Sequence, residues 1–230
     1  MWYGVSPVST LRWLQTLVFG PPGPPMLEEQ RFPHDARGAP DLSYFTRPVT
    51  QYVAYIDEYL AALEPKASGV VIPPEQRTGE WQAHRYRKGV IGSWGLIARG
   101  PGEALPYVLS LLDHAIPEAR EMGAGVLDAW VTSDQRVDVS CHVLAAAERE
   151  ASAPDGVRPE PLGMLLLLLA RLKVSEALPL MARVLRAPES RNGDVDWLAA
   201  EAIMKFSGER VARKAELRDA ANRWLQARGL

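Results

Sequence analysis

Two stretches of the sequence decide the fold, because they repeat one pattern of apolar residues. The first is LIARGPGEALPYVLSLL, residues 96–112, and the second is LLARLKVSEALPLMARVL, residues 168–185. Both contain Glu-Ala-Leu-Pro, and the alanine of the second motif, Ala177, lies 73 residues after Ala104. From this alanine onward, apolar residues fall at offsets 0, 1, 3, 4, 7 and 8, which is one face of an α-helix. The two stretches therefore predict two equivalent helices.

Each of these helices follows another apolar helix across a short break. VIGSWGLIAR (residues 90–99) precedes the first break, GPG, and LGMLLLLLAR (residues 162–171) precedes the second, LKVS. Pro106 and Pro179 lie near the predicted helix starts, where a missing N–H does no harm. A further apolar helix is predicted after each motif. The sequence therefore predicts units of helix, tight turn and helix.

The spacing also predicts a unit between the two motifs. A distance of 73 residues is two units of about 36 or 37, so the middle unit should begin near residue 140. RVDVSCHVLAAAERE (residues 136–150) lies there and has Val139, Val143, Ala146 and Ala147 on one helical face. Three hairpins therefore follow one another, and residues 80–99 supply the second helix of an earlier one. Such units must stack on their neighbours, because one unit alone cannot bury its apolar face.

This pattern resembles the HEAT-repeat family, in the short form common in bacterial proteins. The matching segments are GPGEALPYVLSLLD and VSEALPLMARVL as first helices, and PEAREMGAGVLDAW and DVDWLAAEAIMKF as second helices. The resemblance covers roughly residues 80–206. It implies an all-α fold, a right-handed α-solenoid of stacked helical hairpins. The chain departs from the family in its shorter unit and in two insertions, residues 151–161 and 187–194.

The N-terminal part differs from this repetitive region. Residues 1–40 are predicted to form a helix and a Pro/Gly-rich linker, because GPPGPPMLEEQRFPHDARGAP (residues 20–40) interrupts every periodic pattern. The apolar residues at the start of the chain either pack back onto the repeats or dock into another chain. The solenoid domain is assigned to residues 41–230.

Two further helices are predicted at the ends of this domain. The first runs from near Pro48 to just before Pro65, where apolar residues recur at helical spacing. The last is an amphipathic capping helix, which a solenoid needs to close its exposed end. Its predicted apolar anchors are Val211, Leu217, Ala221, Trp224 and Leu225.

The amino-acid composition of the chain argues against some classes of function. The chain has 230 residues, 47% of them apolar, and a net charge of −2, which argues against a protein that is basic throughout and binds nucleic acid by bulk charge. Its single cysteine, Cys141, excludes an intrachain disulfide. No signal peptide and no membrane span are expected, because the longest apolar run is short and the N-terminus lacks a basic region. We therefore expect a cytoplasmic protein.

Catalytic and metal-binding motifs are not expected. The four histidines have no His-x-x-x-His spacing, and the adjacent Cys141 and His142 should point about 100° apart on a helix. GVIGSWG (residues 89–95) lacks the glycine two residues before Ser93 that a nucleophile elbow needs. Its small residues instead predict a close approach of two helices. No metal and no cofactor are predicted.

Charge and aromatic residues indicate the candidate binding residues. Residues 103–160 contain four basic against eleven acidic residues, whereas residues 205–228 contain seven basic against three acidic. EWQAHRYRKG (residues 80–89) combines arginine with tryptophan and tyrosine, which is typical of interface anchors. The alternative is an ordinary helix with buried aromatics and solvated charges. The candidate partner-binding residues are Trp81, Arg85, Tyr86, Arg87, Lys88, Arg120, Asp128 and Trp197.

These features predict a non-enzymatic scaffold or adaptor that binds another protein through the surface of the solenoid. An immunity protein that masks a toxin is an alternative that fits the same features. The alternative is a HEAT-like DNA-binding enzyme resembling the alkylpurine DNA glycosylases, for which Asp128 and Trp130 would form an acid–aromatic pair. The acidic middle of the chain argues against that alternative, because duplex binding needs a cationic surface. Neither nucleic acid nor a membrane is the expected partner.

Overall fold

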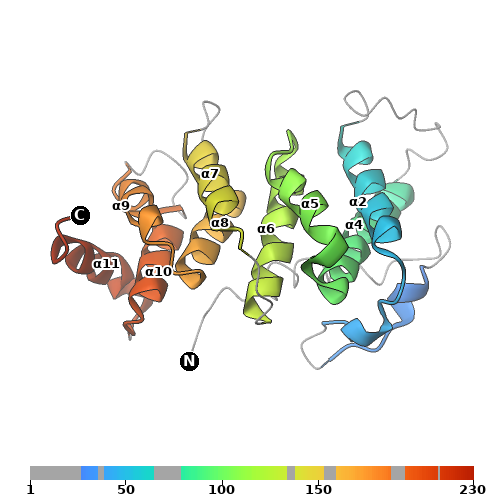
Figure 1. The fold of residues 1–230 in the computed structure, drawn as a ribbon, viewed down its shortest axis with the longest axis horizontal. Coiled ribbons are helices and arrows are strands. Elements are labelled where there is room, and N and C mark those ends of the chain that lie inside the picture. The colour runs from blue at the N-terminus through green and yellow to red at the C-terminus, as the bar shows by residue number, and fades with distance from the viewer. Residues whose placement is uncertain are drawn as a thin grey trace. The chain divides into compact units, whose positions relative to one another are not determined.

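A computed structural model describes residues 27–35, 39–64, 79–133, 138–152, 159–187, 195–211 and 213–230. In these residues the regular structure is nine α-helices and short 3₁₀ turns, without a strand (Figure 1). The predicted all-α class is therefore confirmed. The predicted N-terminal helix and most of both insertions lie outside the described residues.

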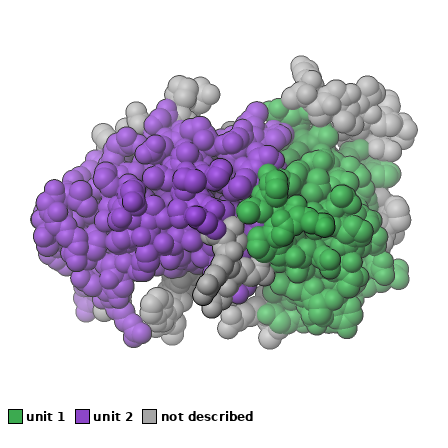
Figure 2. All heavy atoms as spheres, viewed as in Figure 1, with its two compact units in different colours: residues 1–108 green, residues 109–230 purple. Residues whose placement is uncertain are grey.

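The chain divides into two compact units, residues 1–108 and residues 109–230 (Figure 2). Helix α5 contributes to both units, because the division falls inside it. The α-helices in the described residues are α2 (Val49–Leu63), α4 (Gly79–Arg99), α5 (Pro101–Leu112), α6 (Pro117–Thr132), α7 (Ser140–Ala151), α8 (Pro159–Arg171), α9 (Leu178–Leu185), α10 (Val195–Ser207) and α11 (Leu217–Gln226).

In unit 1, α2 packs closely along α4 at glycine positions. A Cβ atom on Gly92 would lie 2.7 Å from the carbonyl oxygen of Tyr52, and a Cβ atom on Gly89 would lie 2.6 Å from a ring carbon of Tyr59. A Cβ on Gly95 would collide with the ring of Tyr52. The predicted role of the small residues in GVIGSWG, the close approach of two helices, is therefore confirmed.

The segment of unit 1 before α2 is held together by an ion pair and a cluster of rings, and it contacts α2 at Tyr52. Glu29, in the 3₁₀ turn η1 (Glu28–Arg31), is buried and pairs with Arg47. The backbone N–H of Arg47 in turn donates a hydrogen bond to the hydroxyl oxygen of Tyr52, 3.2 Å away. The Phe32 ring lies edge-on to Phe45, with 5.2 Å between centroids. This segment includes part of the predicted linker.

In unit 2, α8 lies at the centre of the packing. It contacts α6, α7 and α10, and its buried residues lie all round the helix, including the run 165–170. This explains why LGMLLLLLAR lacks a polar face. A Cβ on Gly163 would collide with the side chain of Leu198, so α8 and α10 approach each other closely. Helix α9 also contacts α10, and α11 contacts both α10 and α9.

Most helix ends lie where the sequence predicts them. Helix α2 runs from Val49 to Leu63, and Pro179 occupies the first turn of α9. Pro106 instead lies inside α5, but the backbone at Gly102 is not helical (φ −19°, ψ −105°), so the regular helix begins only after Gly102. The prediction that proline lies near a helix start is therefore confirmed for α9. For α5 it is correct only if the helix is counted from the kink at Gly102.

The predicted extent of the capping helix is wrong at its start. Helix α11 begins at Leu217, after the 3₁₀ turn η5 (Lys214–Glu216), and Val211 precedes both. The six positions between Val211 and Leu217 correspond to about 600° of helix rotation, which would place the two side chains on different faces. The buried anchors of α11 are Ala221, Trp224 and Leu225.

Candidate interaction surfaces

The basic–aromatic stretch, residues 80–89, lies in the N-terminal half of α4. The guanidinium carbon of Arg85 lies 5.8 Å from the ring centroid of Trp81, one helical turn away, and Arg85 is buried. The Trp81 ring also meets His84 edge-on at 5.6 Å. Burial, followed by the positive charges of Lys88 and Arg87, lowers the pKa of His84 below its ordinary value. His84 is therefore an uncharged packing residue at neutral pH.

The second half of this stretch faces α2. Tyr86 lies edge-on to Tyr59, with 5.6 Å between ring centroids. Lys88 forms an ion pair with Glu58 and lies 5.5 Å from the centroid of the Tyr55 ring. Arg87 is half-buried. The contacts favour the alternative interpretation of this stretch, because Tyr86 and Lys88 contact α2 and Arg85 is buried against Trp81 of its own helix.

Arg120 fastens α6 to α7. Its Nε atom pairs with the buried carboxylate of Glu150, and its Nη1 donates hydrogen bonds to the carbonyl oxygens of His114, 2.8 Å away, and Ala115, 2.9 Å away. A guanidinium with three protein acceptors has few N–H groups left for a partner. The contacts of Arg120 are therefore those of a residue that positions helices.

Asp128 belongs to a buried polar cluster that spans three helices of unit 2. Its carboxylate on α6 lies 2.7 Å from Nη1 of Arg171 on α8, and Arg171 also donates a hydrogen bond to the hydroxyl of Thr132. Burial raises the pKa of Asp128, opposed by the positive charges of Arg171 and of Lys205 on α10. Burial and repulsion from Arg171 lower the pKa of Lys205. The cluster thus balances charge between neighbouring helices.

The acid–aromatic pair predicted for a DNA-binding enzyme is not formed at a surface. Trp130 is completely buried in the core of unit 2, although Asp128 lies two residues before it. Its indole ring is therefore inaccessible to a base in this structure.

Trp197 lies half-buried in the first turn of α10. Its backbone N–H donates to the carboxylate of Asp196, 2.6 Å away, and Asp196 pairs with Arg218 of α11 at 2.7 Å. The eight predicted residues therefore do not form one site within either unit. Five belong to unit 1, and the three in unit 2 make separate contacts.

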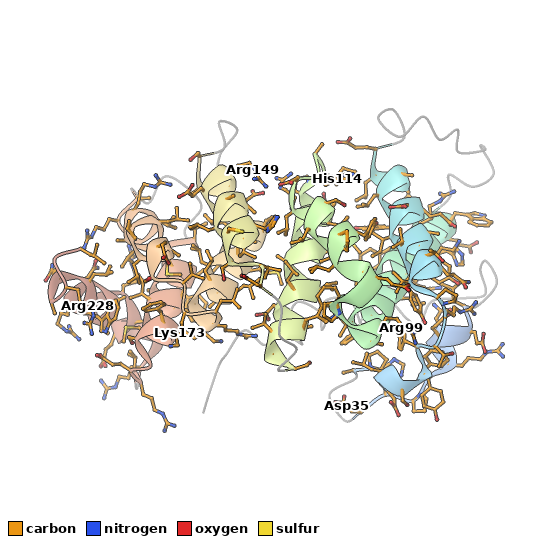
Figure 3. All side chains as sticks on the ribbon, viewed as in Figure 1. Asp35, Arg99, His114, Arg149, Lys173 and Arg228 are labelled. Atoms are coloured by element: carbon orange, nitrogen blue, oxygen red, sulfur yellow. The ribbon has the colours of Figure 1, made fainter. Side chains whose placement is uncertain are left out.

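Sequence reasoning did not select a group of arginines at the α9 and α11 end of unit 2. Arg183 and Arg186 are exposed in the last turn of α9 and just after it, and Arg223 is exposed on α11. Arg228 follows α11, and its guanidinium carbon lies 3.8 Å from the ring centroid of Trp224 (Figure 3 labels Arg228). The excess of seven basic over three acidic residues in residues 205–228 covers Arg223 and Arg228 but not Arg183 and Arg186.

Cys141 and His142 correct one geometric expectation. The Cys141 Sγ atom lies 3.5 Å from His142 Nδ1 on the exposed surface of α7, so the two side chains do approach each other. The approach is possible because both side chains can rotate toward the shared edge of the helix. Within the described ranges, no group of three or more metal-ligating side chains is present.

No helix among the residues that the structure describes has the length and apolar character needed to cross a membrane. No family model, curated protein or solved structure matches this chain. The resemblance to HEAT repeats therefore rests on the sequence pattern and stays a prediction.

Proposed function

We propose that the protein is a non-enzymatic adaptor, a cytoplasmic α-solenoid of HEAT-like hairpins that binds another protein. The observation that carries this proposal is the packing order in unit 2. Helix α8 packs against its own first helix, α7, and against the second helices on either side, α6 and α10, and α10 packs against its own first helix, α9. Stacked hairpins of this kind present a continuous surface built from successive second helices.

The contacts of the polar residues support the same proposal. The largely buried ion pairs Arg120–Glu150 and Asp128–Arg171 each join one helix to another. The second helices keep half-exposed side chains of mixed character, which suits a protein partner better than a small molecule. These residues are Glu118 and Met122 on α6, Met164 on α8, and Trp197 and Glu201 on α10.

The test is capture of a partner from the lysate of the source cell, followed by reconstitution with the purified partner. The informative variant is Glu118→Lys, which reverses a charge on the second helix α6. The matched control is Glu148→Lys, which makes the same charge change on the exposed side of the first helix α7. The proposal expects Glu118→Lys or Trp197→Ala to weaken reconstituted binding at least about tenfold, a loss of about 1.4 kcal/mol, with Glu148→Lys unchanged.

Equal binding by all three variants would contradict the use of this surface. If the captured partner is a toxin whose activity the protein blocks, the adaptor is an immunity protein.

One observation favours the second candidate, a DNA-binding enzyme resembling the alkylpurine glycosylases. Asp128 is a buried carboxylate with a raised pKa beside two cations, an environment in which a carboxyl group can be tuned for catalysis. Release of alkylated bases from methylated duplex DNA, abolished by Asp128→Asn, would establish that activity. The same DNA left intact by the native protein would exclude it.

A further inference from the structure

We propose that Arg183 of α9, Arg186 just after it, Arg223 of α11 and the following Arg228 form a docking surface for an acidic segment of a protein partner. We call this group the arginine end. The inference rests on the proposed adaptor function and adds to it the location of one contact and the charge of the partner.

The first argument is that other cations of unit 2 already have partners in the protein. Arg149 pairs with Asp113, Arg171 with Asp128, and Arg218 with Asp196. The Lys173 ammonium group donates to two carbonyl oxygens at the end of α10. By contrast, Arg183 and Arg223 are exposed and form no ion pair with any residue that the structure describes. Their charge is therefore available to another molecule.

The second argument is that two members of the arginine end are held in place. Arg228 lies over the Trp224 ring at 3.8 Å and donates from Nη1 to the Trp224 carbonyl oxygen, 3.2 Å away. Arg186 donates from Nη2 to the carbonyl oxygen of Leu230, 2.9 Å away, which places the end of α9 beside the residues after α11. A guanidinium has five N–H donors, so each keeps donors for a carboxylate. A restrained side chain also loses less entropy on binding.

The third argument concerns the class of partner. Guanidinium groups bind carboxylates through two parallel hydrogen bonds, so a short run of Asp and Glu can match four arginines. Nucleic acid requires an extended cationic surface, whereas the arginine end consists of four arginines. The acids on α11 and in the turn before it, Glu216 and Asp219, belong to its N-terminal end, and Glu216 lies 3.8 Å from Arg213. An acidic peptide is the better match.

Fluorescence anisotropy with a labelled peptide of about ten glutamates, at roughly 50 mM salt, tests the proposal. The informative variant is Arg183→Glu with Arg223→Glu. The matched control is Arg31→Glu with Arg99→Glu, which makes the same charge change at two exposed arginines of unit 1. We expect the first variant to weaken peptide binding at least about tenfold and the control to change it less than about twofold. Circular dichroism verifies that both variants keep their helices.

Three results with the peptide and a DNA duplex would overturn the proposal. The first is that the native protein does not bind the peptide, and the second is that both variants lose peptide binding equally. The third is that the native protein binds a DNA duplex of roughly 20 base pairs more tightly than the peptide and that the informative variant loses this duplex binding. The last result would assign the arginine end to nucleic acid. If Arg183→Glu with Arg223→Glu retains full binding of a captured protein partner, this inference fails while the adaptor function stands.

Discussion

Lys173 is a residue whose backbone and side chain have opposite effects on stability. Its φ of 56° lies in the left-handed region, which disfavours a residue with a Cβ atom. Its ammonium group compensates by donating to the carbonyl oxygens of Lys205, 3.0 Å away, and Phe206, 2.6 Å away, at the C-terminal end of α10. Cations stabilise this end of a helix.

We expect Lys173→Met to reduce the free energy of unfolding by about 1 kcal/mol, because it removes the cap and keeps the strained backbone. Lys173→Gly removes both the cap and the backbone strain. Its loss of unfolding free energy should therefore be smaller than that of Lys173→Met by about 0.5 kcal/mol or more. Urea denaturation of the two variants measures the difference. Native stability in Lys173→Met would contradict the capping role.

His84 makes stability depend on pH in a defined direction. Because burial lowers its pKa from 6.5 in the native protein, the unfolded chain binds a proton at higher pH than the folded chain does. Stability contributed by uncharged His84 is therefore present above pH 6.5 and is lost as the pH falls below this value. His84→Gln should remove this part of the pH dependence. Denaturation of both proteins between about pH 5 and pH 8 tests the prediction, and parallel curves would contradict it.

At the scale of an element, the packing of α4 against α2 depends on glycine as much as on the apolar residues of α4. Gly92 and Gly95 leave no room for a Cβ atom against α2, whereas nothing lies within 4 Å of such an atom on Gly79. We expect Gly92→Ala and Gly95→Ala each to destabilise the protein by about 2 kcal/mol or more through overpacking. The control, Gly79→Ala, should leave stability within about 0.5 kcal/mol or raise it. Chemical denaturation measures all three, and similar stabilities would show that α2 and α4 can move apart.

The same element shows how far the sequence predicts this protein. Apolar periodicity places a helix over residues 80–99, and the small residues of GVIGSWG predict its close contact with another helix. Periodicity does not predict that Lys88 pairs with Glu58, because an ion pair across helices depends on the angle and register of packing. For that reason the sequence of the basic–aromatic stretch resembles that of an exposed interface. In the structure, several of its side chains instead pack within unit 1.

Pattern reasoning also fails where a segment is too short or too polar to have a period. Val211 is apolar and near an amphipathic stretch, but it precedes α11 by six residues and does not share its buried face. A motif search does not find the arginine end. Its members lie on or just after two helices that are far apart in the sequence and meet only through tertiary contacts. The basic excess of residues 205–228 signals only Arg223 and Arg228, and nothing in the sequence pattern connects them to Arg183 and Arg186.

At the scale of the whole molecule, each of the two units buries a set of apolar residues of its own. The core of unit 1 contains Tyr52, Ile56 and Leu96, and that of unit 2 contains Leu127, Trp130 and the apolar residues of α8. In proteins built from stacked repeats, stability is the sum of terms within and between neighbouring repeats, so distant repeats can open separately. A solenoid fold therefore predicts that a destabilising substitution in one unit has only a small effect on the stability of the other unit.

We expect Gly95→Ala to speed backbone amide exchange in α2 and α4 while leaving α8 and α10 close to their native rates. The reason is that the collision with Tyr52 lies wholly inside unit 1. Hydrogen exchange followed by mass spectrometry measures each helix separately. The reciprocal control is Gly163→Ala, which collides with Leu198 and should affect α8 and α10 alone. Uniform acceleration across all helices in either variant would instead show one cooperative fold and would weaken the case for a repeat architecture.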